Sequence, residues 1–437
     1  MQKGDSTVII AIIDSGVDYY HEDLAGNLWT NVLEANGIAG VDDDGNGFVD
    51  DIHGWDFGDN DADPIHPAVR RDFYEHGTIC TGYCCAVTNN SRGIAGISWN
   101  CKFMPVKNQS NDDSTPEYGY EGIVYAADNG ADIISNSWGG LGSSEWEQEV
   151  LEYAYRRGAI VVCAAGNANL ELPYFPANYH HVISVAAVGI NDAKTSYSNF
   201  GPLVDICAPG GEPGAGQLLT TIPDNRYLEA WGTSIATPIV AGVCGLVKAE
   251  HPDWNATQII RQVLLTADNI DALNPQYAMK LGYGRVNAYR ALTTVNLQDP
   301  DARLILHDFV LDDSSSGKGN NVPEKGETLQ IYCFIRNTSI GSAPAATVRL
   351  SSRSSNIEIL NNSFGPIVFP ADTTMAFDFH ITINENAADE RVQLILELES
   401  GRGYAEEDTI EIAIGVSVKP LLFIDDDKLL PLSLIHI

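Results

Sequence analysis

The first two thirds of the sequence alternate short apolar runs with helix-length segments. The runs are rich in β-branched residues and lack polar alternation, which is typical of strands buried on both faces of a parallel sheet. These expected strands span 8–13, 101–106, 132–135, 159–164 and 182–188. The expected helices between and after them span 78–86, 117–129, 146–157, 234–250 and 256–265, with Asn255 as N-cap of the last. This order predicts a doubly wound α/β fold with a mostly parallel sheet.

The pattern changes after residue 297, where a short polar linker leads into alternating strands separated by Gly, Asn, Ser and Pro. The expected strands of this part span 329–336, 346–350, 356–360, 375–383, 392–398 and 409–416. They predict an immunoglobulin-like β-sandwich at 303–418, after a first domain at 1–297. Since residues 428–437 complete no recognisable element, we expect 419–437 to be an incomplete or artificial segment.

The net charge of the chain restricts the kinds of binding partner that we expect. The 437 residues contain 59 Asp and Glu against 25 Lys and Arg, a formal net charge of −34. A surface that acidic repels nucleic acid and anionic lipid, so we expect neither as a partner. No run reaches the length of a membrane-spanning helix, and residues 1–5 lead directly into the first strand, so neither a membrane span nor a signal peptide is expected. We expect a monomer.

The eight cysteines lie mostly inside apolar runs, where cysteine behaves as a small hydrophobic residue. Their spacing does not repeat the paired pattern of zinc sites. We therefore expect buried free thiols, while a disulfide between Cys80 and Cys101 stays open as an alternative.

Four polar residues occupy positions where chemistry is commonly found. Asp14 closes the first strand, His76 precedes a glycine at a helix start, Asn167 follows a strand, and Ser234 begins an apolar helix. A serine at a helix N-terminus lies among free amides that favour developing negative charge. Each residue taken singly also has an ordinary explanation, as a turn, a surface histidine or an N-cap.

Taken together, the segments around these residues resemble the signature blocks of the subtilisin-like peptidases. The blocks occur in the family's order Asp, His, Ser, and the thermitase-like branch is the most similar. The resemblance extends from about residue 8 to residue 292. The blocks lie at 12–18, 76–78, 136–140, 164–167 and 232–238.

The resemblance implies a serine endopeptidase that cleaves extended polypeptides through an acyl-enzyme. It makes Ser234 the nucleophile, His76 the general base and then acid, and Asp14 the group that orients the imidazole. Asn167 and the backbone N–H of Ser234 would donate to the oxyanion. It also implies a secreted or cell-surface protein, with no cofactor in catalysis.

The same resemblance implies two groups of substrate contacts. One is an edge strand that pairs with the extended substrate, and the other is a wall of the pocket for the side chain that precedes the scissile bond. The edge strand comprises Ser137, Trp138 and Gly139, and the wall comprises Ala164, Ala165 and Gly166. The chain departs from the family pattern at Ile79, Cys80 and Thr81, which we expect to repack behind the site.

An acidic stretch between Asp42 and Asp63 contains nine aspartates and no Lys or Arg, so we expect it to need a counter-charge. Oxygen-bearing residues at alternate positions with glycines between them resemble a Ca²⁺ loop. The ligands expected from this pattern are Asp42, Asp44, Asn46 and Asp51.

The family resemblance implies two further structural Ca²⁺ sites. The second would use Asp56, Asp59, Asp61 and Asp63, although Ile65 stands where the family has a side-chain ligand. The third would use Asp23 and Asn90, together with the carbonyls of Val87, Arg92 and Ile94.

Three alternatives are weighed against a peptidase. A relative that has lost catalysis is disfavoured because all four chemical positions are present. A serine esterase of the α/β-hydrolase type needs Gly-x-Ser-x-Gly and the order Ser, Asp, His, and neither occurs here. A calcium-dependent adhesion module suits the β-rich part at 303–416 but not the first domain.

Overall fold

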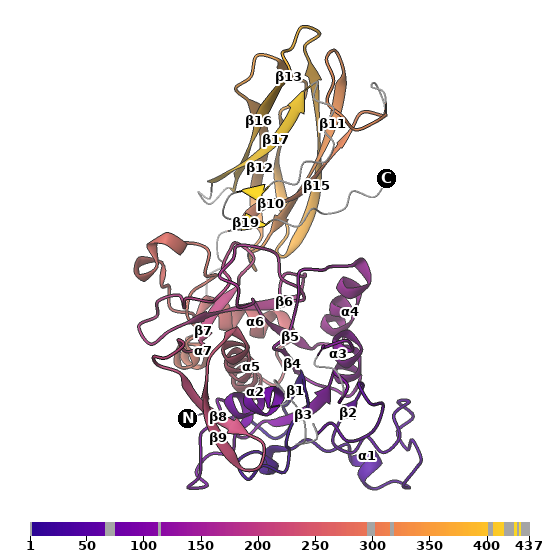
Figure 1. The fold of residues 1–437 in the computed structure, drawn as a ribbon, viewed down its shortest axis with the longest axis vertical. Coiled ribbons are helices and arrows are strands. Elements are labelled where there is room, and N and C mark those ends of the chain that lie inside the picture. The colour runs from indigo at the N-terminus through magenta and orange to yellow at the C-terminus, as the bar shows by residue number, and fades with distance from the viewer. Residues whose placement is uncertain are drawn as a thin grey trace. The chain divides into compact units, whose positions relative to one another are not determined.

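A computed structural model describes residues 2–65, 75–111, 115–294, 302–314, 319–400 and 405–414, and the backbone of 424–425 and 428–429. The chain forms two compact units, 1–297 and 298–437 (Figure 1). In the second unit, β18 (Ile424–Asp425) pairs with β19 (Lys428–Leu429). The remainder of the expected segment 419–437 lies outside the described residues.

The first unit is built on a seven-stranded sheet in the order β2-β3-β1-β4-β5-β6-β7, in which every neighbouring pair is parallel. The strands are β1 (Ile9–Asp14), β2 (Trp55–Asp56), β3 (Lys102–Lys107), β4 (Ile133–Asn136), β5 (Ile160–Ala164), β6 (Val182–Val188) and β7 (Ile206–Pro209). The prediction of a doubly wound α/β fold is confirmed.

Helices cover both faces of this sheet, as the apolar runs predict (Figure 1). Alternate residues of β1 point to opposite faces. Ile10 faces α5, where a Cβ on Gly245 would lie 2.9 Å from its Cδ1, while Ile13 faces α3, where a Cβ on Gly122 would lie 3.0 Å from its Cγ2. The main helices are α2 (His76–Cys85), α3 (Gly119–Asp128), α4 (Glu145–Arg156), α5 (Thr233–Glu250) and α6 (Ala256–Leu265).

The strand order creates the crevice in which the site lies. The chain runs from β1 to β3 on one side and then crosses to β4 on the other side of β1. In such sheets, ligands bind beyond the carboxyl ends of the strands where the order reverses. Asp14 ends β1 and Asn136 ends β4 at this edge.

Helix α6 begins and ends where the sequence predicts. Asn255 caps it through a reciprocal pair of hydrogen bonds with Gln258, each 3.0 Å long. Several elements of two to six residues were not predicted, because a short segment shows too little periodicity. They are β2, β7, the hairpin β8 (Leu218–Ile222) and β9 (Arg226–Ala230), the helices α1 (Val32–Ala35) and α7 (Ala288–Thr293), and the 3₁₀ turns η1 (Ala25–Asn27), η2 (Asp271–Leu273) and η3 (Pro275–Tyr277).

The second unit is all-β, as the alternating pattern predicts. Two four-stranded antiparallel sheets, ordered β10-β11-β15-β13 and β14-β12-β16-β17, contribute to one apolar core. The sequence analysis did not predict β10 and β14. The strands are β10 (Leu304–Asp312), β11 (Thr328–Asn337), β12 (Ala343–Ser352), β13 (Ile357–Ile359), β14 (Ser363–Phe369), β15 (Thr373–Ile383), β16 (Glu390–Glu399) and β17 (Ala405–Ile414).

The structure also describes the state of the cysteines and the character of the helices. All eight cysteines are buried with free thiols, so the alternative of a Cys80–Cys101 disulfide is wrong. Burial raises the pKa of several of them, including Cys101 to about 12, as expected for thiols that act as core residues. Within the described part of the chain, no helix combines the length and the apolar character needed to cross a membrane.

Candidate active site

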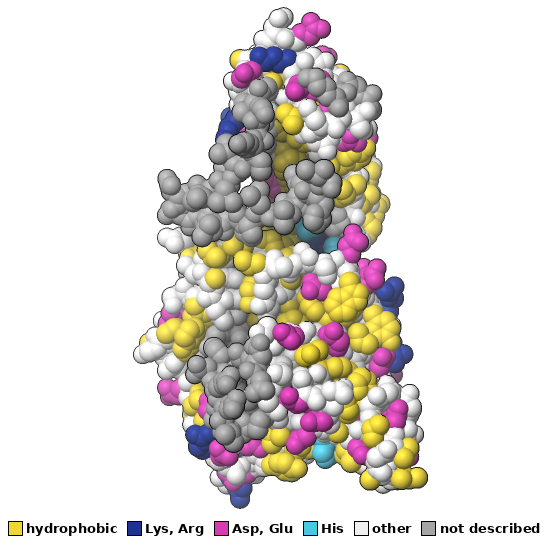
Figure 2. Space-filling model, turned by 45° about the vertical axis from the view of Figure 1, so that its right-hand side comes forward, with side chains coloured by type: hydrophobic (Ala, Val, Ile, Leu, Met, Phe, Trp, Pro, Cys, Tyr) yellow, Lys and Arg dark blue, Asp and Glu magenta, His cyan; other side chains and the backbone are white. Residues whose placement is uncertain are grey.

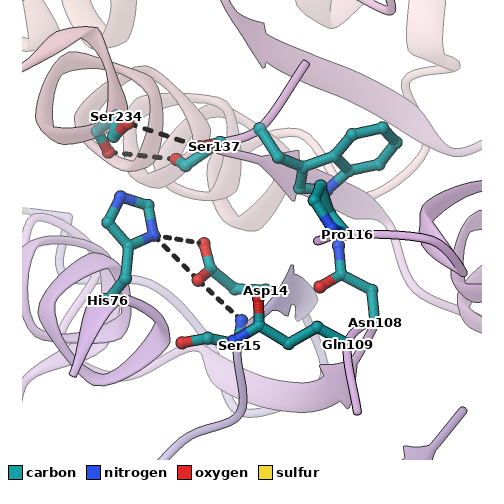
Figure 3. Close-up of a pocket in the computed structure, with 9 residues that line it drawn as sticks. Asp14, Ser15, His76, Asn108, Gln109, Pro116, Ser137 and Ser234 are labelled. Carbon is teal, nitrogen blue, oxygen red and sulfur yellow. Dashed lines mark hydrogen bonds and ion pairs between the residues drawn. The ribbon is translucent and has the colours of Figure 1, made fainter. Parts of the chain in front are cut away.

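Three elements bring Asp14, His76 and Ser234 to the carboxyl edge of the sheet (Figure 3). Asp14 is the last residue of β1, His76 the first of α2, and Ser234 the second of α5. All three line one cavity of about 200 Å³. Residues separated by 220 positions in the sequence therefore face one another.

Asp14 holds His76 through one ring nitrogen. His76 Nδ1 lies 2.8 Å and 3.0 Å from the two carboxylate oxygens, and the backbone N–H of Ser15 donates to the same carboxylate at 2.7 Å. Asp14 is only 5% exposed. In Figure 3 the other ring nitrogen of His76 faces Ser234. This is the orientation that a general base needs toward a hydroxyl group.

The surroundings of His76 favour the protonated form of its imidazole. Burial lowers the pKa of the imidazole, but the Asp14 carboxylate and the Cys80 thiol raise it more, so that the pKa of His76 lies well above its usual 6.5. An imidazolium formed by proton transfer from a nucleophile would be stabilised by the same carboxylate.

Ser234 is not a helix cap. The N-cap of α5 is Gly232, whose φ of 144° belongs to the region that favours glycine. The Ser234 hydroxyl donates to the carbonyl of Ser137 at 3.3 Å, and the Ser137 hydroxyl donates to the carbonyl of Ser234 at 3.0 Å. The ordinary capping explanation is therefore wrong, and Ser234 lies in the first turn, where backbone N–H groups lack intrahelical partners.

Asn167 is exposed beyond the end of β5, but one end of its amide is anchored. Its Oδ1 accepts from both the backbone N–H and the hydroxyl of Thr233, each at 2.8 Å. Thr233 is fully buried, and its hydroxyl accepts from the Gly166 N–H at 3.3 Å. This arrangement turns the donor end, Nδ2, away from Thr233. Thr233 belongs to the block at 232–238, but the sequence analysis assigned it no role.

The two groups of substrate contacts expected from the resemblance lie differently with respect to the cavities beside Ser234. Ser137 and Trp138 line the cavity of about 200 Å³. Gly139 lies beyond β4, and its carbonyl accepts from the Tyr174 hydroxyl at 2.7 Å. The other three expected residues, at the end of β5, do not line the two cavities beside Ser234: Ala164, Ala165 and Gly166. Gly166 must be glycine, since a Cβ would lie 2.4 Å from Asn199 Nδ2.

Cys80 is a neighbour of the site that the sequence analysis only expected to repack. It lies one helical turn after His76, and its sulfur is 3.9 Å from His76 Nδ1 and 3.5 Å from the carbonyl of Ser234. Burial raises the pKa of this thiol. The spacing of four residues along a helix is the signal that places Cys80 behind the imidazole.

The first acidic set forms a cluster that fits the oxygen ligands of calcium. Carboxylate oxygens of Asp44, Asp51 and Glu34 lie within 4.8 Å of one another. Asp51 is fully buried, and burial raises its pKa, which a bound cation would offset. Asn46 donates to Asp44 and Asp51 through Nδ2. Glu34 was not predicted, because it comes from helix α1, outside the acidic run.

Asp42 lies apart from this buried cluster. The backbone N–H groups of Gly47, Gly45 and Asn46 donate to its carboxylate and lower its pKa. Through these hydrogen bonds Asp42 closes the tight turn that positions Asp44 and Asn46.

The second acidic set receives a basic counter-charge from outside the acidic stretch. Lys107, the last residue of β3, is fully buried, and its Nζ lies 2.5 Å from Asp56 and 2.8 Å from Asp59. Burial raises the pKa of Asp56 to about 6, even though Lys107 acts in the opposite direction. Asp61 and Asp63 lie at the surface, where Asp63 accepts from the Tyr19 hydroxyl at 2.7 Å.

The third expected set is brought together by side-chain and backbone hydrogen bonds to Asp23. Asn90 Nδ2 donates to Asp23 at 2.5 Å, and the Ile94 N–H donates to the other carboxylate oxygen at 2.9 Å. The Val87 N–H donates to the Asp23 carbonyl at 2.7 Å. Asp23 is fully buried and organises this loop.

Comparisons with known proteins relate this chain to peptidases. The sequence profile described as the subtilase family matches residues 5–287. Thermitase from Thermoactinomyces vulgaris is 38% identical over 284 residues, covering 65% of this chain and 88% of thermitase. A thermophilic serine proteinase from Bacillus sp. (strain AK1) is 36% identical, covering 67% of this chain and 63% of the relative.

Two further proteins are similar to this chain. The halolysin-like extracellular serine protease Nep of Natrialba magadii is 34% identical, covering 68% of this chain and 49% of that protein. Among solved structures, a protease from Pseudoalteromonas arctica PAMC 21717 is similar with a TM-score of 0.55 and 29% identity, covering 67% of this chain and 90% of that one.

Proposed function

The chain belongs to the subtilase family and is a serine endopeptidase that acts on polypeptides, and from that premise we propose that Asp14, His76 and Ser234 are its catalytic triad. Ser234 Oγ attacks the scissile carbonyl and forms the acyl-enzyme, while His76 takes the proton and later returns it to the leaving amine. Asp14 keeps Nδ1 of His76 protonated and stabilises the imidazolium.

The observation that carries this proposal is the contact between His76 Nδ1 and both oxygens of the buried Asp14, with the other ring nitrogen facing Ser234 (Figure 3). A histidine held in this way has its tautomer and its orientation set by the carboxylate. The loss of catalysis in this chain is disfavoured, because every group that the reaction needs is present.

We further propose that Asn167 Nδ2 and the backbone N–H of Ser234 stabilise the tetrahedral oxyanion. The anchoring of Asn167 Oδ1 by Thr233 supports this role, because a donor that is already oriented needs no reorganisation as charge develops. Ser137, Trp138 and Gly139 would pair with the extended substrate on the acyl side, and Ala164, Ala165 and Gly166 would form a wall of the adjoining pocket.

Calcium is proposed as a structural ion of the acidic stretch. The set of Asp44, Asp51 and Glu34 offers three carboxylates within reach of one ion, and Asp42 and Asn46 shape the loop around it. Calcium there would hold the segment that precedes His76, and it supplies no group to the reaction. The sets of Asp56, Asp59, Asp61 and Asp63 and of Asp23 and Asn90 stay weaker proposals, because Lys107 and backbone N–H groups already contact their aspartates.

We infer that the protein acts outside the cell or at its surface. A relative described as extracellular, Nep, is 34% identical, and the acidic composition favours solubility in water. We also propose that it works as a monomer, since all the residues of the proposed site come from one chain.

The test of this function is active-site labelling with a fluorophosphonate followed by peptide mapping. The label is expected on Ser234. Ser234→Ala should abolish labelling and casein hydrolysis while leaving the melting temperature unchanged, with residual catalysis of about 10³–10⁴-fold over water, a magnitude taken from subtilisin-type enzymes. Ser143→Ala, at an exposed loop position, is the matched control. Undiminished hydrolysis by purified Ser234→Ala protein would disprove the assignment.

A further inference from the structure

A second cavity, of about 430 Å³, lies on the other side of the proposed nucleophile. It shares His76 and Ser234 with the cavity already described, but none of its other lining residues. Those other residues come from the helix starts of α2 and α5, the end of β9 and the loop after β5. They are Glu75, Ile79, Asn167, Ala230, Trp231 and Ile235.

The position of this cavity relates it to the leaving group. The first cavity contains Ser137 and Trp138, which we assign to the acyl side of the substrate. A peptide that crosses Ser234 must therefore continue into the second cavity beyond the scissile bond. His76, which returns a proton to the leaving amine, lines both cavities.

The lining combines an apolar wall with one carboxylate. Trp231 is 43% exposed at this wall, where its ring packs against Tyr197 at 4.9 Å between centroids, and Ile79 and Ile235 add further apolar surface. Besides His76, Glu75 is the one titratable side chain among those lining residues that the structure describes. An exposed indole ring such as that of Trp231 can pack against an alkyl stem or a cation.

Within the part of the chain that the structure describes, the carboxylate of Glu75 is only weakly neutralised. Its side chain is 27% exposed, and the nearest ion-pair contact, with Arg226 Nη2, is 4.0 Å long. Arg226 lies closer to Asp224, at 3.4 Å. A carboxylate in this setting retains most of its capacity to bind a cation from the substrate.

From these observations we propose that Glu75 and Trp231 make this cavity select Lys or Arg as the residue that follows the scissile bond. The inference rests on the proposed function of Ser234. The net charge of −34, seen as acidic side chains spread over the face drawn in Figure 2, would also attract cationic segments of substrate. Trp231 would contact the methylene stem, and Glu75 would pair with its charged end.

The experiment compares three internally quenched peptides that differ only in the residue after the scissile bond: Lys, norleucine or Glu. Norleucine keeps the alkyl stem of lysine without its charge. We expect kcat/KM to be about three- to fivefold higher for Lys than for norleucine, as for a partly exposed ion pair, and lowest for Glu. Glu75→Gln should bring the Lys and norleucine values together, and Glu75→Lys should favour Glu.

Ratios within one variant separate selectivity from general effects on catalysis. Glu149→Gln, at an exposed position of α4, is the matched control and should keep the wild-type ratios. Equal losses for all three peptides in Glu75→Gln would show that Glu75 acts on His76, and would overturn the inference while leaving the peptidase function intact. An absence of cleavage of every peptide by the wild-type protein would instead contradict the proposed function itself.

Discussion

At the scale of single residues, Thr233 explains how the exposed side chain of Asn167 can be held in a fixed orientation for its proposed role as an oxyanion donor. Its hydroxyl and backbone N–H occupy the two acceptor positions of Asn167 Oδ1, so the amide cannot flip without losing both hydrogen bonds. Thr233 itself is fixed because it is buried at the start of α5. The residue before the proposed nucleophile would therefore position the second of the proposed oxyanion donors.

We predict that Thr233→Val lowers kcat several-fold with little change in KM, because it removes one of the two anchors and leaves the backbone N–H. Asn167→Ala should lower kcat by about 10²–10³, a magnitude borrowed from subtilisin. Steady-state kinetics on both variants and on the double variant check this. If Thr233 acts through Asn167, the double variant equals Asn167→Ala; additive losses would contradict the positioning role.

The contact between Asp14 and His76 predicts the pH dependence of activity. His76 must be neutral to accept the proton of Ser234, and its pKa is raised by Asp14. Activity should therefore fall as the pH drops through a value above the usual 6.5 of histidine. The pH profile of kcat/KM measures this limb. In Asp14→Asn it should move to lower pH, and a limb that stays in place would show that another group titrates.

The same pKa shift has a consequence for stability. Because the folded-state pKa of His76 is above its unfolded value, protonation of His76 contributes stability that is fully present below the unfolded pKa. That contribution is lost as the pH rises through the folded pKa. Activity and this part of the stability therefore change in opposite directions over the same pH range.

At the scale of elements, helix α1 and the loop from Asp42 to Asp51 act together. Glu34 of α1 accepts the N–H groups of Asp43 at 2.7 Å and of Asp44 at 3.0 Å through one oxygen, and that of Asp50 at 3.0 Å through the other. The loop is therefore wrapped around the carboxylate of Glu34, a residue of α1. With Asp44 and Asp51 nearby, a bound cation would offset the repulsion between these carboxylates.

We predict that chelation lowers the melting temperature by unfolding this loop. Binding to the folded state alone stabilises by about 2.7 kcal/mol at 100 times Kd, which corresponds to a shift on the order of a few degrees in a unit of this size. Melting curves with EDTA and with millimolar calcium measure it, with Ser234→Ala as background to prevent autolysis. An unchanged midpoint would show that no calcium is bound.

The matched variants for this test are Glu34→Gln and Glu149→Gln. Glu34→Gln removes one charge of the cluster and should reduce the difference between the two melting curves. Glu149→Gln changes an exposed residue of α4 and should leave the difference as in the wild type. Equal effects of the two substitutions would contradict a calcium site at Glu34.

At the scale of the whole molecule, the proposed site belongs entirely to the first unit. The family match ends at residue 287, and the proposed catalytic and substrate-binding residues lie between Asp14 and Ile235. The second unit has its own apolar core. We therefore treat 1–297 as the peptidase domain and the following β-rich unit as a separate module.

We predict that a protein ending at residue 297 retains kcat/KM on short peptides within about twofold, since no residue of the proposed site is removed. Each unit has its own apolar core, so removing the second unit leaves the core of the first intact. Peptide hydrolysis by the full chain and by the shortened form, at matched concentrations of fluorophosphonate-titrated sites, measures it. A tenfold loss per active site would show that the β-rich unit takes part in catalysis.

The sequence by itself determined the parts of this protein that depend on local pattern. The buried strands, α6 with its Asn255 cap, and the blocks around Asp14, His76 and Ser234 were all predictable, because periodicity, capping and motif order are written in neighbouring residues. The choice of a doubly wound sheet followed by a β-rich unit also came from the order of such patterns.

Only the tertiary structure decided which distant residues meet. Lys107 as the partner of Asp56, Glu34 as a member of the acidic cluster, and Glu75 beside Trp231 each join segments that no periodicity relates. The physical reason is that charge pairing and cavity shape depend on distances in space, and the chain path sets those distances only after the sheet has formed. Local sequence therefore identified the groups that we propose to react, and folding decided the groups that surround them.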